Sequence, residues 1–434
     1  MVNYSKNKVN SFFSIYLPST LTILIPFLLL TGSFLPDLAV TLCALFFLYY
    51  SLKYPKKYVN YYKNKFFIYL IIFWSIIIIS SLFSQNILFS LETSFFYIRF
   101  ILFSLSTWFL LKNYPRFITL FYYSLIFTIS ILILDSFLQF FTKQNIFGWP
   151  IIGTRLSSFF KDELILGSYL SRLLPLLFAL YVYHNEILQN YLNKYIYAII
   201  FILSEILIFL SGERAAFFYL HLSAFFIIIF SKNYKYLRLT ILILSILSMI
   251  LITFFDNNFK KRIVDYTIEQ IAPSNAKEKK LLFFSVEHEN HYKSALLMFK
   301  ENMLIGVGPR MFRQLCNYPE FKTSRESCST HPHNTYIQLL AETGILGFVQ
   351  IFLLFLLLIY FSIKHLYLKI FKNVILFNDF HIALLSAILI SLWPFTPTGN
   401  FFSNSLNVYY YLPLGFLFFT FNNSKIIKTK NKIK

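Results

Sequence analysis

The stretch Ser329-Thr-His-Pro-His-Asn-Thr-Tyr-Ile-Gln-Leu-Leu-Ala-Glu-Thr-Gly-Ile-Leu-Gly347 ends the one long polar segment of the chain and begins an apolar one. Pro332 and Asn334 favour the first turn and the cap of a helix that starts here. Asn334, Gln338 and Glu342 recur every four residues, so they form one polar stripe along an otherwise apolar helix. Within a membrane, such a stripe has to face protein or water rather than lipid.

His333 stands directly before this predicted helix. Unpaired backbone N–H groups and the positive end of the helix favour anions there and disfavour a protonated imidazole. A neutral imidazole beside an anion site has the property that a general base needs near pH 7. His333 is therefore the candidate base of a reaction on an anionic substrate.

The composition is that of a membrane protein. Of the 434 residues, 57% are hydrophobic and 13% are charged, and apolar runs of about 20 residues recur along the chain. In a soluble protein the net charge of +20 would suggest nucleic acid, but here Lys and Arg gather in short loops, as the positive-inside rule requires. No nucleic-acid partner is expected. The basic and apolar N-terminal segment shows no small-residue cleavage site, so it is interpreted as the first span.

The apolar runs predict an all-α polytopic membrane protein with about twelve transmembrane helices and one long periplasmic loop. The predicted spans are 14–33, 36–53, 66–84, 93–111, 117–141, 163–183, 195–211, 214–231, 237–255, 335–363, 378–394 and 405–421. They divide the chain into nine helices (1–255), the loop region (256–334), and three helices with a basic tail (335–434). Because the clusters of Lys and Arg in the short loops fall on one side in this arrangement, both termini are expected in the cytoplasm. Lys260, Lys261 and Arg262 lie on the other side, in the long loop, to which the rule does not apply.

Two of the three cysteines lie in the long loop on the outer side. Cys316 and Cys328 form a plausible disulfide in an oxidising compartment, although two free thiols are an equal alternative. Cys43 lies inside the second predicted span and is interpreted as a small apolar residue. The chain has no CxxC, HExxH, carboxylate cluster, P-loop or dinucleotide fingerprint, so neither a metal nor a cofactor is predicted.

Two arginines near the outer ends of spans are candidates for binding phosphate. Arg214 begins an apolar run after Glu213, and a guanidinium fork suits phosphate better than an ammonium group does. The alternative for Arg214 is an interfacial side chain that reaches lipid headgroups or pairs with Glu213. Arg155 lies in an aromatic outer loop, where a simple surface position is equally compatible.

Arg99 lies a turn or two below the outer end of the fourth predicted span. An ionisable residue at that depth is a functional candidate, unless an acidic partner such as Glu92 or Asp162 pairs with it. In the long loop, His288 and His291 are interpreted as solvated residues.

Glycines mark structural turns in the same loop and, at Gly344, in the segment that follows it. Gly306, Gly308 and Pro309 predict a structural turn. Gly344 follows the polar stripe of the predicted helix.

These motifs resemble those of the O-antigen ligase and polymerase superfamily. His333-Asn334, followed after nine residues by Gly344, resembles its His-Asn/Ser/Gln-x9-Gly signature, and Ser211–Phe218 is similar to its Arg-x3-Leu element. Gly306–Phe312 resembles its Gly-x-Gly-Pro-x-x-Phe turn, and Arg155–Gly167 resembles the segment that enters its sixth span. The resemblance extends over roughly residues 150 to 420.

The resemblance implies a GT-C-like fold and a metal-independent, inverting glycosyl transfer on the periplasmic face of the bacterial inner membrane. The donor would be a glycan on undecaprenyl pyrophosphate. The acceptor would be lipid A–core in a ligase, or another carrier-linked repeat in a polymerase. His333 would accept the proton of the acceptor hydroxyl, while Arg214 and Arg155 would hold the pyrophosphate and stabilise its charge as it leaves. Arg99 and Asn334 are further candidates for substrate binding.

One departure from the family pattern concerns a second loop cation. Members commonly carry an Arg shortly before the Gly-x-Gly-Pro turn, where this chain has His288. Arg262 is the candidate substitute for substrate binding, and Arg310 is an alternative that could supply the charge.

An O-antigen ligase is the leading hypothesis, favoured by the His-Pro-His-Asn run and the single large outer loop. A polymerase is the close alternative because the shared motifs serve both activities. A transporter of lipid-linked sugars is the weaker alternative. It predicts internal repeats and charges near the bilayer midplane, whereas the sequence shows no such repeat and its candidate charged residues lie at the outer edge.

Overall fold

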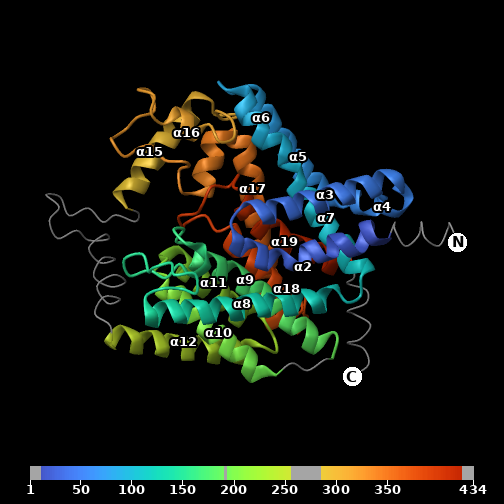
Figure 1. The fold of residues 1–434 in the computed structure, drawn as a ribbon. Coiled ribbons are helices and arrows are strands. Elements are labelled where there is room, and N and C mark those ends of the chain that lie inside the picture. The colour runs from blue at the N-terminus through green and yellow to red at the C-terminus, as the bar shows by residue number, and fades with distance from the viewer. Residues whose placement is uncertain (1–10, 190–192, 256–284, 423–434) are drawn as a thin grey trace.

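The computed structural model describes residues 11–189, 193–255 and 285–422, and its regular secondary structure there is helical (Figure 1). The elements are η1 Phe12–Tyr16, α2 Leu17–Leu28, η2 Leu29–Thr31, α3 Phe34–Lys53, α4 Pro55–Tyr62, α5 Lys65–Leu82, α6 Ile87–Phe96, α7 Ile98–Asn113, α8 Phe117–Thr142, η3 Ser158–Phe160, α9 Leu166–Glu186, α10 Lys194–Leu210, α11 Arg214–Phe230, α12 Lys235–Phe255, α15 Val286–Glu301, α16 Phe312–Leu315, α17 Thr335–Phe371, α18 Asp379–Ser391 and α19 Asn404–Asn422.

Eight helical segments are long and apolar enough to cross a membrane, so the chain is a multi-pass membrane protein. Each of the twelve predicted spans overlaps a helix, but four of these helices (α10, α11, α18 and α19) are not among the eight segments, and the number twelve stays a prediction. The predicted span 93–111 differs most, because two helices, α6 and α7, occupy 87–113 and meet at Tyr97.

Asparagine side chains begin several of these helices. In each case the side-chain oxygen accepts a hydrogen bond from a backbone N–H of the first turn, which would otherwise lack a partner. The capping residues are Asn64 (α5), Asn86 (α6), Asn193 (α10), Asn334 (α17) and Asn378 (α18). Local sequence therefore sets where these helices start.

The centre of the bundle is formed by α7, α9 and α18, the three helices with the largest buried share. The helix α7 packs on α3 and α19, while α9 packs on α11 and α18. The helices α8, α10 and α12 lie along the lower side of Figure 1, and α15 and α16 lie at the upper left, next to the start of α17. The short helix α4 lies on the opposite side of the view from α15.

The helix α17 is interrupted at Gly344, whose backbone is non-helical (φ 63°, ψ −166°). The turn that contains Gly306 docks into this interruption. Its backbone bonds are Val307 N to Ala341 O (2.9 Å), Gly308 N to Glu342 O (3.0 Å) and Ile345 N to Met303 O (2.8 Å). A Cβ atom on Gly306 or on Gly344 would overlap the opposing backbone, so glycine is required on both sides of this contact.

Candidate functional site

His333 lies in a cluster of four imidazoles, called here the histidine cluster, made of His288, His291, His331 and His333. The centroid of the His333 ring is 4.1 Å from that of His331, 5.2 Å from that of His288 and 5.4 Å from that of His291. The interpretation of His288 and His291 as solvated residues is wrong. They are three residues apart on one face of α15, and the packing of α15 against α17 turns that face toward His333.

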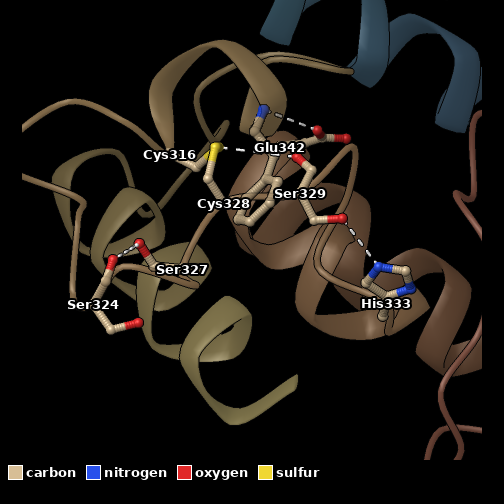
Figure 2. Close-up of a disulfide and its surroundings, with 8 residues drawn as sticks. Cys316, Ser324, Ser327, Cys328, Ser329, His333 and Glu342 are labelled. Carbon is tan, nitrogen blue, oxygen red and sulfur yellow. Dashed lines mark hydrogen bonds between the residues drawn. A yellow bond between two sulfur atoms is a disulfide. The ribbon is translucent and has the colours of Figure 1, made fainter. Parts of the chain in front are cut away.

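The imidazole of His333 is neutral. Burial is the first cause and the three neighbouring imidazoles are the second, and together they lower the pKa of His333 to about 3. Burial likewise lowers the pKa of His331 to about 4. The sequence predicted a neutral His333 for another reason, the positive end of the helix. The ring Nε2 lies 3.1 Å from the hydroxyl of Ser329 (Figure 2).

The loop 394–400 holds the segment that carries His333. Thr398 donates its N–H to the carbonyl of His333 (2.9 Å), and the Nε2 of His331 lies 3.2 Å from the carbonyl of Thr398. Asn334 caps α17 with its side-chain oxygen, which accepts the N–H of Tyr336 at 3.0 Å. Its Nδ2 donates to the carbonyl of Pro394 (2.8 Å). These bonds fix His331, the backbone of His333, and Asn334.

The polar stripe of α17 faces protein, as predicted. Gln338 donates to Asn400 (2.8 Å) and to the carboxylate of Glu342 (2.9 Å). Glu342 is fully buried and also accepts the N–H of Phe312 (3.1 Å), which begins α16. The stripe therefore joins α17 to the 394–401 loop on one side and to the Gly306–Phe312 turn on the other.

Cys316 and Cys328 form a disulfide, which was one of the two predicted alternatives. Cys328 directly precedes Ser329, whose hydroxyl contacts His333 (Figure 2). The disulfide thus anchors the segment that enters the histidine cluster from one side, while Thr398 anchors it from the other. Cys43 is free and buried.

The structure brings Arg155 and Arg214 together at the turn between α10 and α11. The Nε of Arg155 donates to the carbonyl of Ser211 (2.9 Å), three residues before Arg214. Burial lowers the pKa of Arg155, the nearby carboxylate of Glu213 opposes this shift, and the charge of Arg214 adds to it.

Glu213, which directly precedes Arg214 in this turn, binds the first turn of α9. Its carboxylate accepts the N–H of Gly167 (2.6 Å), and the N–H (3.0 Å) and hydroxyl (2.6 Å) of Ser168. Burial raises the pKa of Glu213, and these hydrogen bonds oppose that shift.

A cavity of about 750 Å³ lies between η2, the 149–165 loop, the start of α9 and the start of α19. Its walls combine aromatic rings with hydroxyl, amide and charged groups, a mixture suited to binding a polar ligand of considerable size. The lining includes Trp149, Phe159, Lys161, Ser168, Tyr169, Arg172, Gly399, Asn400, Ser403 and Tyr409.

Two of these walls connect the cavity to the predicted site residues. Gly399 and Asn400 directly follow Thr398, which is bonded to His333. On the other wall, Ser168 is bonded to Glu213, which precedes Arg214. The ring of Phe218, one turn after Arg214, also lies 5.8 Å from that of Trp393, next to the Pro394 that binds Asn334.

Arg99 does not line the 750 Å³ cavity. Arg99 forms a salt bridge with Asp37 of α3 (2.8 Å), not with Glu92 or Asp162 as the sequence suggested, because α3 packs against α7. It borders a second, smaller cavity of about 230 Å³. Arg310 borders this cavity too and contacts Thr93 of α6 (3.2 Å).

Arg262 lies outside the described residues. Three described residues that the sequence analysis did not select lie near the site: Arg172, Arg313 and His331. Arg313 lies in α16, burial lowers its pKa, and its charge contributes to the low pKa of His331. Arg172 lines the 750 Å³ cavity and is only 6% exposed. A signal for Arg172 was present, because it is a charged residue inside the predicted span 163–183.

Comparison with protein families gives a match between residues 198–352 and the family model described as O-antigen ligase. The matched region extends from α10 into α17 and includes Arg214, the Gly306 turn, His333 and Gly344. Comparison with curated proteins gives no match. The family match confirms, over this region, the resemblance to the O-antigen ligase-like superfamily.

Proposed function

We propose, on the basis of the O-antigen ligase region at 198–352, that this membrane protein is an O-antigen ligase. It transfers a glycan from undecaprenyl pyrophosphate to a sugar of lipid A–core, on the periplasmic face of the bacterial inner membrane. The observation that carries the proposal is the segment Thr398–Asn400. It is bonded to the loop of the neutral His333 at one end and lines the 750 Å³ cavity at the other.

In the proposed reaction, the imidazole of His333 accepts the proton of the acceptor hydroxyl. The hydroxyl oxygen attacks the anomeric carbon of the donor glycan from the face opposite the diphosphate, so the configuration inverts. The bond between the anomeric carbon and the diphosphate oxygen breaks, and the diphosphate leaves with the bonding electrons. The step is metal-independent because the guanidinium groups of Arg155 and Arg214 stabilise the charge of the leaving group.

The low pKa of His333 arises from groups of the protein itself. A pKa of about 3 describes an imidazole that neighbours other imidazoles and a buried surface. A bound diphosphate carries negative charge, and a nearby negative charge favours the protonated imidazole, so it raises the pKa of His333. The base therefore becomes stronger when the donor is present. In this mechanism, Asn334 positions His333 through its bonds to Tyr336 and Pro394.

The test is a lipopolysaccharide gel from a strain that lacks the gene, complemented with wild type, His333→Ala or His221→Ala. His221 is the control because it lies within α11, the helix that Arg214 begins, and its ring bonds to the carbonyl of Phe217 in the same helix. We expect core without repeats, and glycan accumulating on the carrier lipid, in the null strain and in His333→Ala. His221→Ala should restore the ladder, and all variants should be present in the membrane by immunoblot.

Two other results point elsewhere. Core that bears a single repeat in the null strain would identify a polymerase, the alternative that shares these motifs. A ladder unchanged in the null strain would exclude both activities for the glycan tested.

A further inference from the structure

Arg172 is a buried cation on the wall of the 750 Å³ cavity. It lies in α9, is 6% exposed, and lines the cavity together with Ser168 and Tyr169 of the preceding turn. Its guanidinium lies 5.2 Å from the centre of the Tyr219 ring. Within the part of the chain that the structure describes, Arg172 forms no salt bridge, whereas the buried Arg238 pairs with Glu205 at 2.6 Å.

None of the described carboxylates lies within salt-bridge distance of Arg172, including those of Asp162 and Glu163, which line the same cavity. Glu213 reaches α9 one turn before Arg172, but its oxygens are bonded to Gly167 and Ser168. A buried charge without a counter-charge is costly, and contact with an aromatic face offsets only part of that cost. A buried guanidinium that lines a cavity and has no salt-bridge partner therefore indicates that an anionic group of a ligand pairs with it.

The depth of Arg172 indicates which part of the ligand it meets. It lies six residues after Leu166, the first residue of α9, which is about 9 Å along the helix at 1.5 Å per residue. A lipid-linked glycan has its chain in the bilayer and its sugars outside, so its phosphates lie at the membrane interface between them. Arg172 is on the membrane side of the cavity, while the Lys161–Asp162 pair, which is largely exposed, lies at the outer loop.

Tyr219 connects this residue to the predicted arginine pair. It lies on α11, five residues after Arg214, and α11 packs on α9. The helices that carry Arg172 and Arg214 are therefore neighbours in the bundle. Resting on the proposed function, we infer that Arg172 is a third diphosphate-binding arginine, which binds the phosphates of the lipid-linked donor at the membrane side of the cavity.

The experiment measures binding to the purified full-length protein in lipid nanodiscs. The probes are undecaprenyl diphosphate, undecaprenyl monophosphate and uncharged undecaprenol. The variants are Arg172→Met and Arg172→Lys, and the control is Arg325→Gln, which changes an exposed arginine of the long loop before α17. We expect Arg172→Met to bind the diphosphate at least tenfold more weakly and the uncharged lipid unchanged. Arg172→Lys should recover only part of the affinity, because an ammonium group lacks the bidentate fork.

The thermal midpoint of the unliganded protein separates a binding role from a structural one. If the charge of Arg172 is paired only when a ligand anion is bound, Arg172→Met removes an unpaired buried charge from the unliganded protein. The thermal midpoint of the variant should then equal or exceed that of wild type. A lowered midpoint without ligand would assign Arg172 to the fold and overturn the inference. Unchanged diphosphate affinity in Arg172→Met would overturn it as well.

The outcomes also separate this inference from the proposed function. Wild type that does not bind the diphosphate probe would contradict the proposed function itself. If wild type binds the probe and transfers glycan, and Arg172→Met does so equally well, the proposed function holds but Arg172 does not bind the diphosphate. A defect seen only with donors whose sugars are acidic would place the anion on the glycan instead, and that also contradicts a diphosphate role.

Discussion

The four imidazoles around His333 are the most unusual feature at the scale of single residues. Burial lowers the pKa of His288 and of His291 as well as those of His331 and His333. No three of the described His, Cys, Asp or Glu residues are arranged as a metal-binding group would be. Protonation of one imidazole of the cluster disfavours protonation of its neighbours. The electrostatic state of the cluster depends on pH and on which anion is bound.

We predict that the loop 329–334 opens more easily as the pH falls from 6.5 toward 4. An unfolded histidine has a pKa near 6.5, whereas His331 and His333 have folded values of about 4 and about 3. The stability that depends on their neutral form is therefore complete above pH 6.5 and is lost as the pH falls, because the open state binds protons first. Hydrogen exchange of residues 329–334, corrected for the intrinsic rate, measures this opening.

The histidine-free loop 143–160 is the internal control for that measurement. The charged groups that act on the cluster are Glu287, Arg313 and Glu326, and the two carboxylates favour protonation of His291. Equal protection of 329–334 at pH 7.5 and pH 5, after correction, would show that the imidazoles titrate alike in the open and closed loop.

At the scale of elements, the interrupted helix α17 and the Gly306 turn form one unit. We predict that Gly306→Ala and Gly344→Ala each lower the thermal midpoint strongly. Both positions have positive φ (68° and 63°), and an added Cβ would overlap the opposing backbone. A crowded substitution of this kind costs about 1–3 kcal/mol beyond the strain of the positive φ.

Gly148→Ala is the matched variant for this comparison. Gly148 also has a positive φ (78°), but an added Cβ there meets nothing within 4 Å. It should therefore show only the backbone strain, about 1–2 kcal/mol. If all three variants lose the same stability, the close contact between the turn and α17 contributes nothing measurable.

The disulfide between Cys316 and Cys328 is the second feature at the scale of elements, and it restrains the segment before Ser329. We predict that the double variant Cys316→Ser/Cys328→Ser remains in the membrane but transfers less glycan, because the segment before Ser329 gains freedom. The cysteines are 12 residues apart, and closing a loop of that size stabilises a fold by about 3 kcal/mol in the chain-entropy treatment. Proteolysis near Arg325, an exposed residue between the two cysteines, reports the loosening.

Reductant treatment of wild type should have the same effect as the double variant, and it should have no effect on the variant itself. Cys43→Ser provides the control for losing a thiol, since that cysteine is free and buried. Rapid cleavage in oxidised wild type would mean that the loop is open with the disulfide intact.

At the scale of the whole molecule, the structure supports a multi-pass membrane protein, and the orientation is still a prediction. We predict that an impermeant maleimide added to whole spheroplasts labels a cysteine at Glu301 of α15 and does not label one at Lys57 of α4. Both positions are exposed, and the positive-inside rule places α4 in the cytoplasm. Labelling of both after permeabilisation controls for reactivity, and the reverse pattern would invert the topology.

Some features followed from the sequence alone, because they depend on neighbours in the chain. Apolar runs of sufficient length become helices in a membrane, and asparagines such as Asn64 and Asn334 cap the first turn of the helix that follows them. The polar stripe of α17 followed from helical periodicity. The neutral His333 followed as well, although burial rather than the helix end is its main cause.

Other features depend on how helices pack, and only the tertiary structure decided them. The bond between Arg99 and Asp37 joins residues 62 positions apart, and that between Arg155 and Ser211 joins residues 56 apart. The meeting of His288 and His291 with His333, and the cavity beside Arg172, also require specific helix faces to come together. Local propensity carries no information about which faces meet. The residues that carry chemistry could be proposed from the sequence, but their grouping into a site is a property of the packed bundle.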